Sequence, residues 1–321
     1  MTHDAGDDGI TLDSTCSTSK QKRRPPRTKR YRHCSFFCAY HYDLSNEFYS
    51  LWLDRKMLYS CAYFEHPEQG LDAAQFGKLD YLCRKLRLHA GDRLLDIGCG
   101  WGGLMMHAAR EYGVRVVGIT LSDHQFDWCR KHIETHGLAQ QCEVRLMDHR
   151  DLDATETYDR IVSVGMVEHV GQDLLPDYFR QAYRLLRTGG LFLNSGIGRP
   201  GRCREIEPKI AFTDRYIFPD GELVSIATLL SSAEQEGFEV RDVENLREHY
   251  MLTVRHWLRR LHDAADAARR IVGETKFRMW RLYLAGSAYY FCRGWLDLYH
   301  SLLIKPEKNV ANALTHADWF R

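Results

Sequence analysis

Three glycines at alternate positions, Gly98, Gly100 and Gly102, stand directly behind an acidic residue, Asp96. Glycines let a backbone come close to a ligand, and Asp96 offers a hydrogen-bond acceptor at the end of a short apolar run. The residues from Leu104 onward are typical of a helix, whose first N–H groups are free to bind a ligand. This order of strand, glycine turn and helix predicts a binding site for a nucleotide-like cofactor.

The spacing of the turn separates two cofactor classes. It resembles the D-x-G-x-G-x-G turn of class I S-adenosylmethionine (SAM) methyltransferases more than the G-x-G-x-x-G turn of dinucleotide-binding proteins. A short glycine motif by itself often marks only a tight structural turn. Here a second apolar strand, Val114–Ile119, follows at the expected distance and favours a cofactor site. Thr120 stands where most such folds carry an acid that binds the ribose.

The elements that must position this turn alternate between strands and helices. Further strands are expected at Cys142–Met147 and Tyr158–Val164, with helices at Gln125–His136 and Leu174–Leu186. Such alternation predicts an α/β fold with a doubly wound, mostly parallel sheet, which binds ligands at the carboxyl ends of its strands. Glu168 directly follows the fourth strand and a short apolar run, so we expect it at this ligand side rather than on an ordinary surface.

Composition limits the other possibilities. The 321 residues include 44 Lys and Arg and 43 Asp and Glu, so the net charge of +1 favours no class of partner. No apolar run reaches the roughly 20 residues of a bilayer span, and the polar start is not typical of a signal peptide. We therefore expect a cytoplasmic protein. The ten cysteines show no metal-binding spacing, which predicts reduced thiols and no metal site.

Residues 1–38 are expected to form a disordered, basic N-terminal tail, with a cluster of lysines and arginines between Lys20 and Arg32. The cluster is either a solvated extension or a surface that meets anionic lipids at the inner membrane face. Near such a membrane each basic residue contributes about 1 kcal/mol. No recognition motif accompanies the cluster, so we expect no nucleic-acid partner.

Several further motifs, in a fixed order, narrow the class of protein. They are His41–Tyr49, the hexapeptide Tyr59–Phe64, Gly98–Gly102, Thr120–Ser122 and Glu168–Gly171. Together they resemble the cyclopropane-fatty-acyl-phospholipid synthases and the mycolic acid cyclopropane synthases, from about Ala39 to Pro306. The resemblance implies a SAM-dependent methyltransferase domain over residues 39–306, with substrate-binding helices inserted at about 199–235 and 250–300. Residues 307–321 are then a C-terminal tail.

The resemblance also implies which residues contact SAM. The positions that match the family's cofactor site are Tyr59, Ser60, Asp96, Gly98, Gly100, Thr120, Leu121, Gln125, Asp148 and His149. The resemblance also explains why Thr120 is not acidic, because the family carries Thr-Leu-Ser where other such folds carry the acidic residue that binds the ribose. His149 stands where the family places an aromatic ring over the adenine, and an imidazole can stack in the same way. The alternative for His149 is an exposed loop residue.

The chemistry implied by the resemblance is transfer of the SAM methyl group to a cis double bond of an acyl chain, which leaves a carbocation. Such a cation needs negative or π-electron density nearby and a base to remove a proton. In the family this base is a bound bicarbonate. The matching ligands are the backbone amide of Cys61, Glu168 and Tyr250. Without the resemblance, Cys61 could be a packed core thiol and Tyr250 a packing aromatic.

The fourth bicarbonate ligand of the family, a histidine, is replaced here by Ser195. A serine hydroxyl still hydrogen-bonds an anion, but it is shorter than histidine and brings no positive charge. The resemblance implies methyl transfer to an unsaturated acyl lipid, ending in a cyclopropane ring, and Ser195 is the reason to keep other products open. The alternatives are a methyl-branched or methylenated product, or methylation of an isoprenoid or natural-product alkene. A SAM-binding scaffold without activity is disfavoured, because the other three ligands are retained.

The stretch Met279–Leu298 is rich in aromatic residues. One interpretation is a buried amphipathic helix that closes the sheet. The other is one wall of an acyl tunnel, with aromatic faces turned toward the cation. The sequence predicts neither the identity of the alkene nor the oligomeric state.

Overall fold

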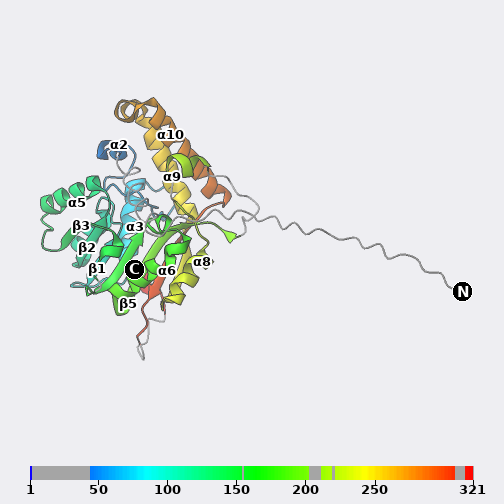
Figure 1. The fold of residues 1–321 in the computed structure, drawn as a ribbon. Coiled ribbons are helices and arrows are strands. Elements are labelled where there is room, and N and C mark those ends of the chain that lie inside the picture. The colour runs from blue at the N-terminus through cyan, green and yellow to red at the C-terminus, as the bar shows by residue number, and fades with distance from the viewer. Residues whose placement is uncertain (2–43, 154, 202–210, 219–220, 308–314, 321) are drawn as a thin grey trace.

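The computed structural model describes Met1 and residues 44–153, 155–201, 211–218, 221–307 and 315–320. Apart from Met1, the expected basic tail lies outside the described residues. Figure 1 shows a central sheet with helices on both faces. Its strands are β1 (Arg93–Ile97), β2 (Arg115–Thr120), β3 (Cys142–Leu146), β4 (Tyr158–Val164), β5 (Leu186–Gly198), β6 (Glu239–Asn245) and β7 (Asp297–Ile304).

The seven strands lie in the order β3-β2-β1-β4-β5-β7-β6. The neighbours from β3 to β5 are parallel, whereas β7 is antiparallel to both β5 and β6. The doubly wound, mostly parallel α/β sheet predicted from the sequence is confirmed. The chain reverses its direction across the sheet between β1 and β4, and such a switch point opens a crevice at the carboxyl ends of the strands.

The two faces of the sheet are covered by different helices. On one face lie α3 (Leu71–Lys85), α4 (Gly103–Tyr112) and α5 (Asp123–Thr135), which bury their apolar side chains against the strands. The other face is covered by α6 (Leu175–Leu185) and α8 (Ile226–Gln235). Leu191 and Leu193 of β5 enter one core and Phe192 enters the other, which explains the three consecutive apolar residues at this point of the strand.

A second core, made mostly of aromatic rings, joins α2 (Asn46–Ser50), α9 (Arg247–Asp263) and α10 (Ala265–Arg293). These three helices lie together at the top of Figure 1. Trp101, which follows the carboxyl end of β1, packs into this core and donates a hydrogen bond of 2.7 Å to Asn46 Oδ1. The second core therefore covers the end of the sheet at which the ligand crevice opens.

The aromatic stretch Met279–Leu298 differs from its prediction as one helix. Helix α10 ends at Arg293, Gly294 adopts a left-handed φ of 66°, and β7 begins at Asp297. A glycine in this conformation is a common helix C-terminus, and only Asp297 and Leu298 of the stretch lie in β7. The helices predicted at Gln125–His136 and Leu174–Leu186 correspond to α5 and α6, and each bound agrees within two residues.

Short elements complete the fold. They are α7 (Ala211–Tyr216) and the single turns η1 (His149–Asp151), η2 (Val167–His169), η3 (Gln172–Leu174) and η5 (Ala317–Phe320). Within the expected C-terminal tail, η5 buries Trp319 against the core beside α3. Arg87 Nε also binds Asp318 Oδ2 at 2.6 Å, so this segment is fixed to the domain.

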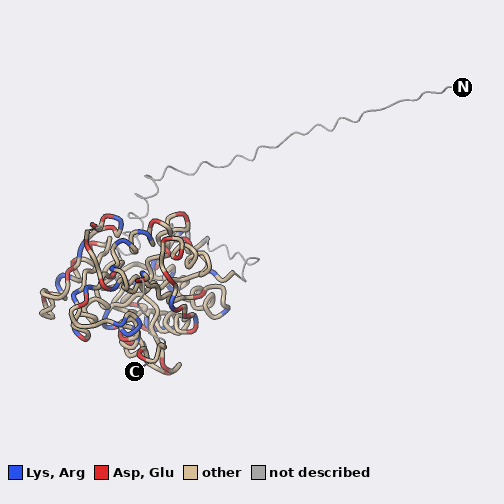
Figure 2. The backbone as a smooth tube through the Cα atoms, turned by 90° about the horizontal axis from the view of Figure 1, so that it is seen from below, with Lys and Arg blue, Asp and Glu red and all other residues tan. Residues whose placement is uncertain are grey.

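Charged side chains of both signs are interspersed along the chain, as Figure 2 shows. None of the helices in the described ranges is long and apolar enough to cross a membrane.

Candidate active site

The glycine turn lies between β1 and α4, as predicted. Gly98, Gly100 and Gly102 adopt φ angles of 82°, 56° and 78°, a region that L-residues rarely enter. The amides of Gly98 and Cys99 both donate to the carbonyl of Ile119 on β2, at 3.1 and 2.9 Å. The turn is thus held open by the neighbouring strand, with the N-terminus of α4 directly behind it.

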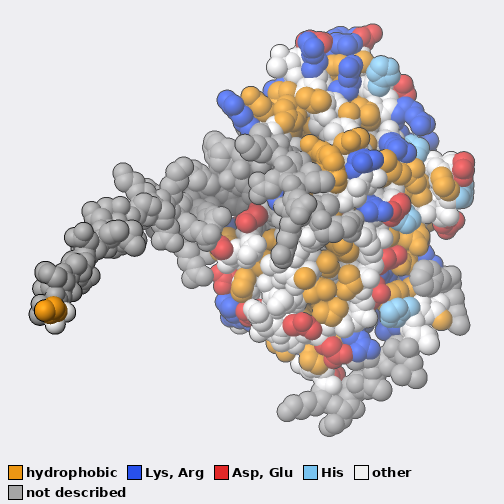
Figure 3. All heavy atoms as spheres, turned by 90° about the vertical axis from the view of Figure 1, so that its right-hand side faces the viewer, with side chains coloured by type: hydrophobic (Ala, Val, Ile, Leu, Met, Phe, Trp, Pro, Cys, Tyr) orange, Lys and Arg blue, Asp and Glu red, His pale blue; other side chains and the backbone are white. Residues whose placement is uncertain are grey.

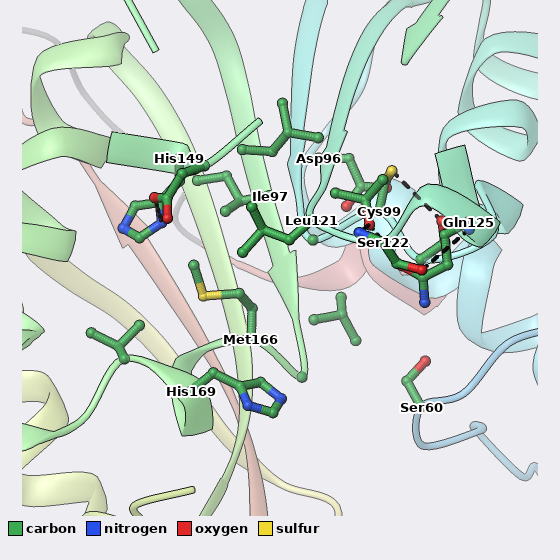
Figure 4. A pocket seen from close by; sticks show the side chains of 18 of the residues that line it. Ser60, Asp96, Ile97, Cys99, Leu121, Ser122, Gln125, His149, Met166 and His169 are labelled. Carbon is green, nitrogen blue, oxygen red and sulfur yellow. Dashed lines mark hydrogen bonds and ion pairs between the residues drawn. The ribbon is translucent and has the colours of Figure 1, made fainter. Parts of the chain in front are cut away.

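A cavity of about 650 Å³ opens at this turn, a size typical of cofactor sites. Figure 4 shows its side chains converging from β1, from the segment after β2, and from the segments after β3 and β4. All ten residues expected to bind the cofactor line this one cavity: Tyr59, Ser60, Asp96, Gly98, Gly100, Thr120, Leu121, Gln125, Asp148 and His149.

Asp96 lies deep in the cavity. Its Oδ2 atom is buried and has no hydrogen-bond partner in the described part of the chain. Burial raises the pKa of Asp96 to about 7, opposed by the nearby charge of Lys78. A buried acceptor without a partner costs free energy, so it fits a site where a ligand supplies the donor.

Lys78 was not predicted to belong to the site. It is buried on α3, lines the cavity, and its Nζ donates a hydrogen bond of 2.9 Å to Ser60 Oγ. Burial lowers the pKa of this lysine to about 8. In the sequence it resembles any lysine on the polar face of a helix, so no local signal could have identified it.

Thr120 occupies the end of β2 and begins a chain of hydrogen bonds. Its hydroxyl donates to Gln125 Oε1 at 2.7 Å and accepts from the amide of Ser122 at 3.2 Å. Ser122 in turn caps α5 by accepting from the amide of Gln125. These bonds fix Gln125 at the wall of the cavity.

Asp148 and His149 lie on the opposite wall. Burial opposes ionisation of Asp148, but hydrogen bonds from His149 and Arg150 outweigh it and hold the pKa of this carboxyl below its usual range. The His149 ring meets Tyr178 edge-on, with 5.5 Å between ring centroids. His149 is therefore a wall residue of the cavity (Figure 4) rather than an exposed loop histidine.

The four residues expected to be catalytic lie behind this cavity and do not line it. They come from four elements: Cys61 precedes α3, Glu168 lies in η2, Ser195 in β5 and Tyr250 in α9. Cys61 and Tyr250 pack together with Ile197 in a small apolar cluster. The amide of Ile197 donates to Glu168 Oε1 at 2.7 Å, which brings the carboxylate to the same cluster.

Glu168 lies beside the cavity, because its neighbour His169 lines the cavity wall. Its Oε2 atom is buried and accepts no hydrogen bond from the described residues. Burial raises the pKa of Glu168 to about 7. Burial also raises the pKa of the Cys61 thiol, so the thiol stays neutral and any anion must be bound by the backbone of Cys61.

Helix α9 holds the hexapeptide Tyr59–Phe64 in place. The amide of Ala62 donates to Thr253 Oγ1 at 2.9 Å, and the amide of Phe64 donates to His249 Nδ1 at 3.0 Å. These bonds orient the peptide so that Tyr59 and Ser60 reach the cavity while Cys61 reaches the apolar cluster.

Aromatic rings separate the cavity from the second core. The Tyr59 ring lies 5.2 Å from Trp257 and 5.4 Å from Trp52, measured between centroids. Its hydroxyl donates a hydrogen bond to the Tyr283 hydroxyl at 3.4 Å. A wall of this kind offers both apolar contact and π-electron density.

Comparison with known proteins identifies this architecture. The family described as mycolic acid cyclopropane synthetase matches residues 29–301. This chain belongs to that family. It is 48% identical over 292 residues to a probable fatty acid methyltransferase of Pseudomonas putida, covering 88% of this chain and 73% of that protein. It is 38% identical over 268 residues to cyclopropane mycolic acid synthase 3 of Mycobacterium tuberculosis, covering 80% and 93%.

The fold agrees with this assignment. The crystal structure of mycolic acid cyclopropane synthase CmaA1 complexed with SAH and CTAB matches with a TM-score of 0.80 and 35% identity. The match covers 84% of this chain and 97% of the other. The chain is therefore a SAM-dependent methyltransferase of the cyclopropane synthetase family, and the resemblance derived from its motifs is confirmed.

Two further cavity residues follow β4 and were not predicted as site residues. Met166 and His169 both line the wall (Figure 4). Burial lowers the pKa of His169 to about 4, so this imidazole is neutral near pH 7. The signal for His169 was its place in the Glu168–Gly171 motif, whereas Met166 reads as an ordinary apolar residue after the strand.

Proposed function

We propose that this enzyme transfers a methyl group from SAM to a carbon–carbon double bond of an unsaturated acyl chain and closes a cyclopropane ring. The observation that carries the proposal is the convergence of Glu168, Cys61 and Tyr250 on one apolar cluster beside the cofactor-sized cavity. The name of the Pseudomonas putida relative, a probable fatty acid methyltransferase, supports an acyl substrate.

The cavity fits SAM in its chemistry. Bound there, SAM would supply an electrophilic methyl group. Asp96 offers the unpartnered acceptor, Gly98 and Gly100 leave the backbone open to close approach, and His149 presents a ring that can stack on a base. Thr120, Leu121 and Gln125 then bind the ribose side in place of the missing acid. The remaining contacts to SAM would come from three other residues that line the cavity, Tyr59, Ser60 and Asp148.

Methyl transfer to an alkene leaves positive charge on the acyl chain. The aromatic rings around Tyr59 provide π-electron density for this cation, and Glu168 provides negative charge once it is ionised. Loss of one proton from the methyl carbon lets the electron pair of its C–H bond close the ring. The same wall excludes water, which would otherwise trap the cation as an alcohol.

We propose bicarbonate as the base that accepts this proton. The amide of Cys61 donates no hydrogen bond to any of the described residues, and the Tyr250 ring packs in the same cluster. A free amide and a phenol hydroxyl are donors that suit an oxyanion. The buried Glu168 Oε2 has no hydrogen-bond partner among the described residues, so the ionised carboxylate would accept a hydrogen bond from the hydroxyl of the bicarbonate.

A second outcome is favoured by Ser195. Its hydroxyl is buried on the face that leads to Ile197, but it is shorter than an imidazole and has no charge. A weaker anion site would let the cation lose a proton from a different carbon, which leaves a double bond in place of the ring. The alternative function is therefore formation of a methyl-branched or methylenated product, or methylation of another hydrophobic alkene.

We further propose that the enzyme works at the cytoplasmic surface of a membrane. On α10, Leu282 and Tyr289 are 59% and 52% exposed, and Arg278, Arg281 and Arg293 on the same helix are exposed as well. Figure 3 shows apolar patches interrupted by charged side chains on the face it displays. Exposed apolar and basic residues on one helix suit shallow contact with anionic lipid. The basic cluster between Lys20 and Arg32 would add attraction.

The proposal is tested by labelling cells that express the protein with isotope-labelled methionine. Lipids and small metabolites are then analysed by mass spectrometry. A product heavier by about 14 mass units, one added CH₂, is expected in an acyl lipid, and NMR then distinguishes a ring from a branch or methylene. Cells expressing the Glu168→Gln variant are the control. Labelled product confined to a non-acyl alkene would overturn the lipid assignment, and no labelled product at all would favour the scaffold.

A further inference from the structure

Three side chains form a row across the antiparallel end of the sheet. Ser195 on β5 lies directly opposite His300 on β7, and His300 lies directly opposite Glu244 on β6. Residues paired in this way point to the same face, with Cβ atoms about 4.5–5.5 Å apart. The imidazole of His300 is thus placed between the serine hydroxyl and the glutamate carboxylate.

One ring nitrogen of His300, the middle residue of the row, has no hydrogen-bond partner among the described residues. His300 and Ser195 are each only 2% exposed, and His300 Nδ1 forms no hydrogen bond within the described part of the chain. Glu244 is already occupied, because its Oε2 accepts from the Tyr81 hydroxyl and from Lys85 Nζ, both at 2.9 Å. Leaving a buried ring nitrogen unpaired is unfavourable, and a bound ligand that pairs with it would remove this cost.

The row adjoins the cluster in which we place the anion. Two positions along β7, Leu298 packs against Cys61, and its partner on β5 is Ile197, whose amide binds Glu168. Two residues along a strand span about 6.6 Å, which is within reach of an imidazole. The charge of Lys78 acts on both the Cys61 thiol and the His300 ring, as expected if they share one buried pocket.

We propose that His300 on β7 is a ligand of the proton-accepting anion. Together with Ser195 it would bind the anion at the position where a longer residue on β5, in place of Ser195, would bind it. This inference rests on the proposed function, because it names a further residue for the same reaction. Ser195 is short, whereas the residue paired with it on the neighbouring strand carries an imidazole on the same face.

The protonation state of His300 suits this role. Burial and the charges of Lys85 and Lys78 lower the pKa of the ring, so it is neutral at physiological pH. A neutral imidazole donates one hydrogen bond to the anion and carries no charge that would repel the acyl cation. The proton lost from the methyl carbon passes to the anion, the C–H electron pair closes the ring, and His300 keeps its own proton.

The test moves the imidazole from β7 to β5 in the full chain. His300→Gln retains hydrogen-bonding groups of similar reach but removes the ring, and we expect turnover to fall by about 10²-fold with a higher bicarbonate requirement. The affinity for SAM should not change. The double variant Ser195→His with His300→Gln should recover turnover to within about tenfold of the wild type, because the imidazole returns to the same pocket from the other strand.

The matched control is His107→Gln. His107 on α4 is also buried, and its Nε2 likewise lacks a partner among the described residues, but it packs against Phe76 away from the row. This variant should retain turnover and bicarbonate dependence, which separates loss of a buried imidazole in general from loss of the anion ligand.

The outcomes are distinguishable. Full turnover with unchanged bicarbonate dependence in His300→Gln would overturn the inference and leave the proposed function intact. A double variant that folds but is no more active than His300→Gln would also overturn it. If His300→Gln does not fold, His300→Asn takes its place, and full turnover with unchanged bicarbonate dependence in that variant would overturn the inference. Absence of any methylated product from the wild type would overturn both proposals.

Discussion

Thr253 Oγ1 accepts a hydrogen bond of 2.9 Å from the amide of Ala62, a residue 191 positions earlier in the chain. The same hydroxyl donates to the carbonyl of His249 at 2.7 Å, and Thr253 is completely buried. One hydroxyl therefore connects α9 to the hexapeptide that supplies Tyr59 to the cavity and Cys61 to the apolar cluster.

Replacing Thr253 by Val should remove this connection without changing the side-chain shape. The Ala62 amide would be left buried and unpaired, which costs about 1–3 kcal/mol and should lower Tm by roughly 2–8 °C. Turnover should fall more than SAM affinity, because Cys61 depends on the hexapeptide backbone for its position. Thr253→Ser, which keeps the hydroxyl, should behave like the wild type in both melting and turnover assays. Thr135→Val on the exposed end of α5 is the control for loss of a threonine hydroxyl in a helix.

Gly100 tests the cofactor turn directly. Both Gly100 and Gly137 have positive φ angles, 56° and 68°, and nothing lies within 4 Å of a Cβ built on either. An alanine therefore meets the same backbone strain of about 1–2 kcal/mol at both sites, but only at Gly100 does it enter the cavity. Calorimetric titration should show a Kd for SAM raised at least about tenfold in Gly100→Ala and unchanged in Gly137→Ala. Equal SAM affinity in the two variants would contradict the cofactor site.

His149 is expected to stack on the adenine of SAM. Stacking of a base on an aromatic side chain contributes about 1–3 kcal/mol, so His149→Ala should raise the Kd for SAM roughly 5- to 150-fold. His149→Phe should retain most of the affinity, because it keeps an aromatic face. His136→Ala, at the exposed end of α5, is the control. If the phenylalanine variant binds as weakly as the alanine variant, the role of His149 is its hydrogen bond to Asp148 rather than stacking.

The parallel half of the fold and its cofactor turn could be predicted from the sequence because their signals are local. The turn from Gly98 to Gly102 needs positive φ angles at fixed positions, and glycine is the residue that adopts them readily. The motifs around Tyr59 and Glu168 then carried the family resemblance, and every predicted cofactor residue lines the same cavity.

What could not be predicted depends on contacts between distant segments. The row of Ser195, His300 and Glu244 exists only because β7 inserts antiparallel between β5 and β6, and no local pattern states which strands pair. Lys78 was missed for the same reason, since its burial depends on how α3 packs against the hexapeptide. One interpretation of Met279–Leu298 is a single helix, but α10 ends at Arg293, and the two residues of the stretch that lie in β7 are too few to show a strand pattern.

The basic cluster between Lys20 and Arg32 can be tested by deletion of residues 1–32. If the cluster contacts membranes, the shortened protein should sediment less with vesicles rich in phosphatidylserine, and equally with neutral phosphatidylcholine vesicles. SAM affinity should not change. A full-length variant with glutamine at the basic positions of the cluster keeps the segment but removes its charge, so it shows whether vesicle binding depends on the charge or on the presence of the segment. Equal sedimentation of all three proteins would leave the segment a solvated extension.

We expect ionisation of Glu168 to have opposite effects on activity and stability: turnover rises with pH, and the stability of the fold falls. Burial raises its pKa to about 7, so the carboxylate needed for catalysis forms only as pH rises through 7, and turnover should increase over that interval. Because the folded-state pKa lies above the unfolded value, protonated Glu168 contributes stability that is complete at low pH and lost as pH rises through about 7. Glu168→Gln is neutral at every pH. It should therefore reduce turnover by roughly 10²–10⁴-fold, and its Tm relative to that of the wild type should be higher at pH 8 than at pH 5. Two results would contradict this role of Glu168. One is a Glu168→Gln variant with the turnover of the wild type, and the other is a wild-type turnover that does not change with pH near 7. Either would show that the proton acceptor of the reaction does not depend on this carboxylate.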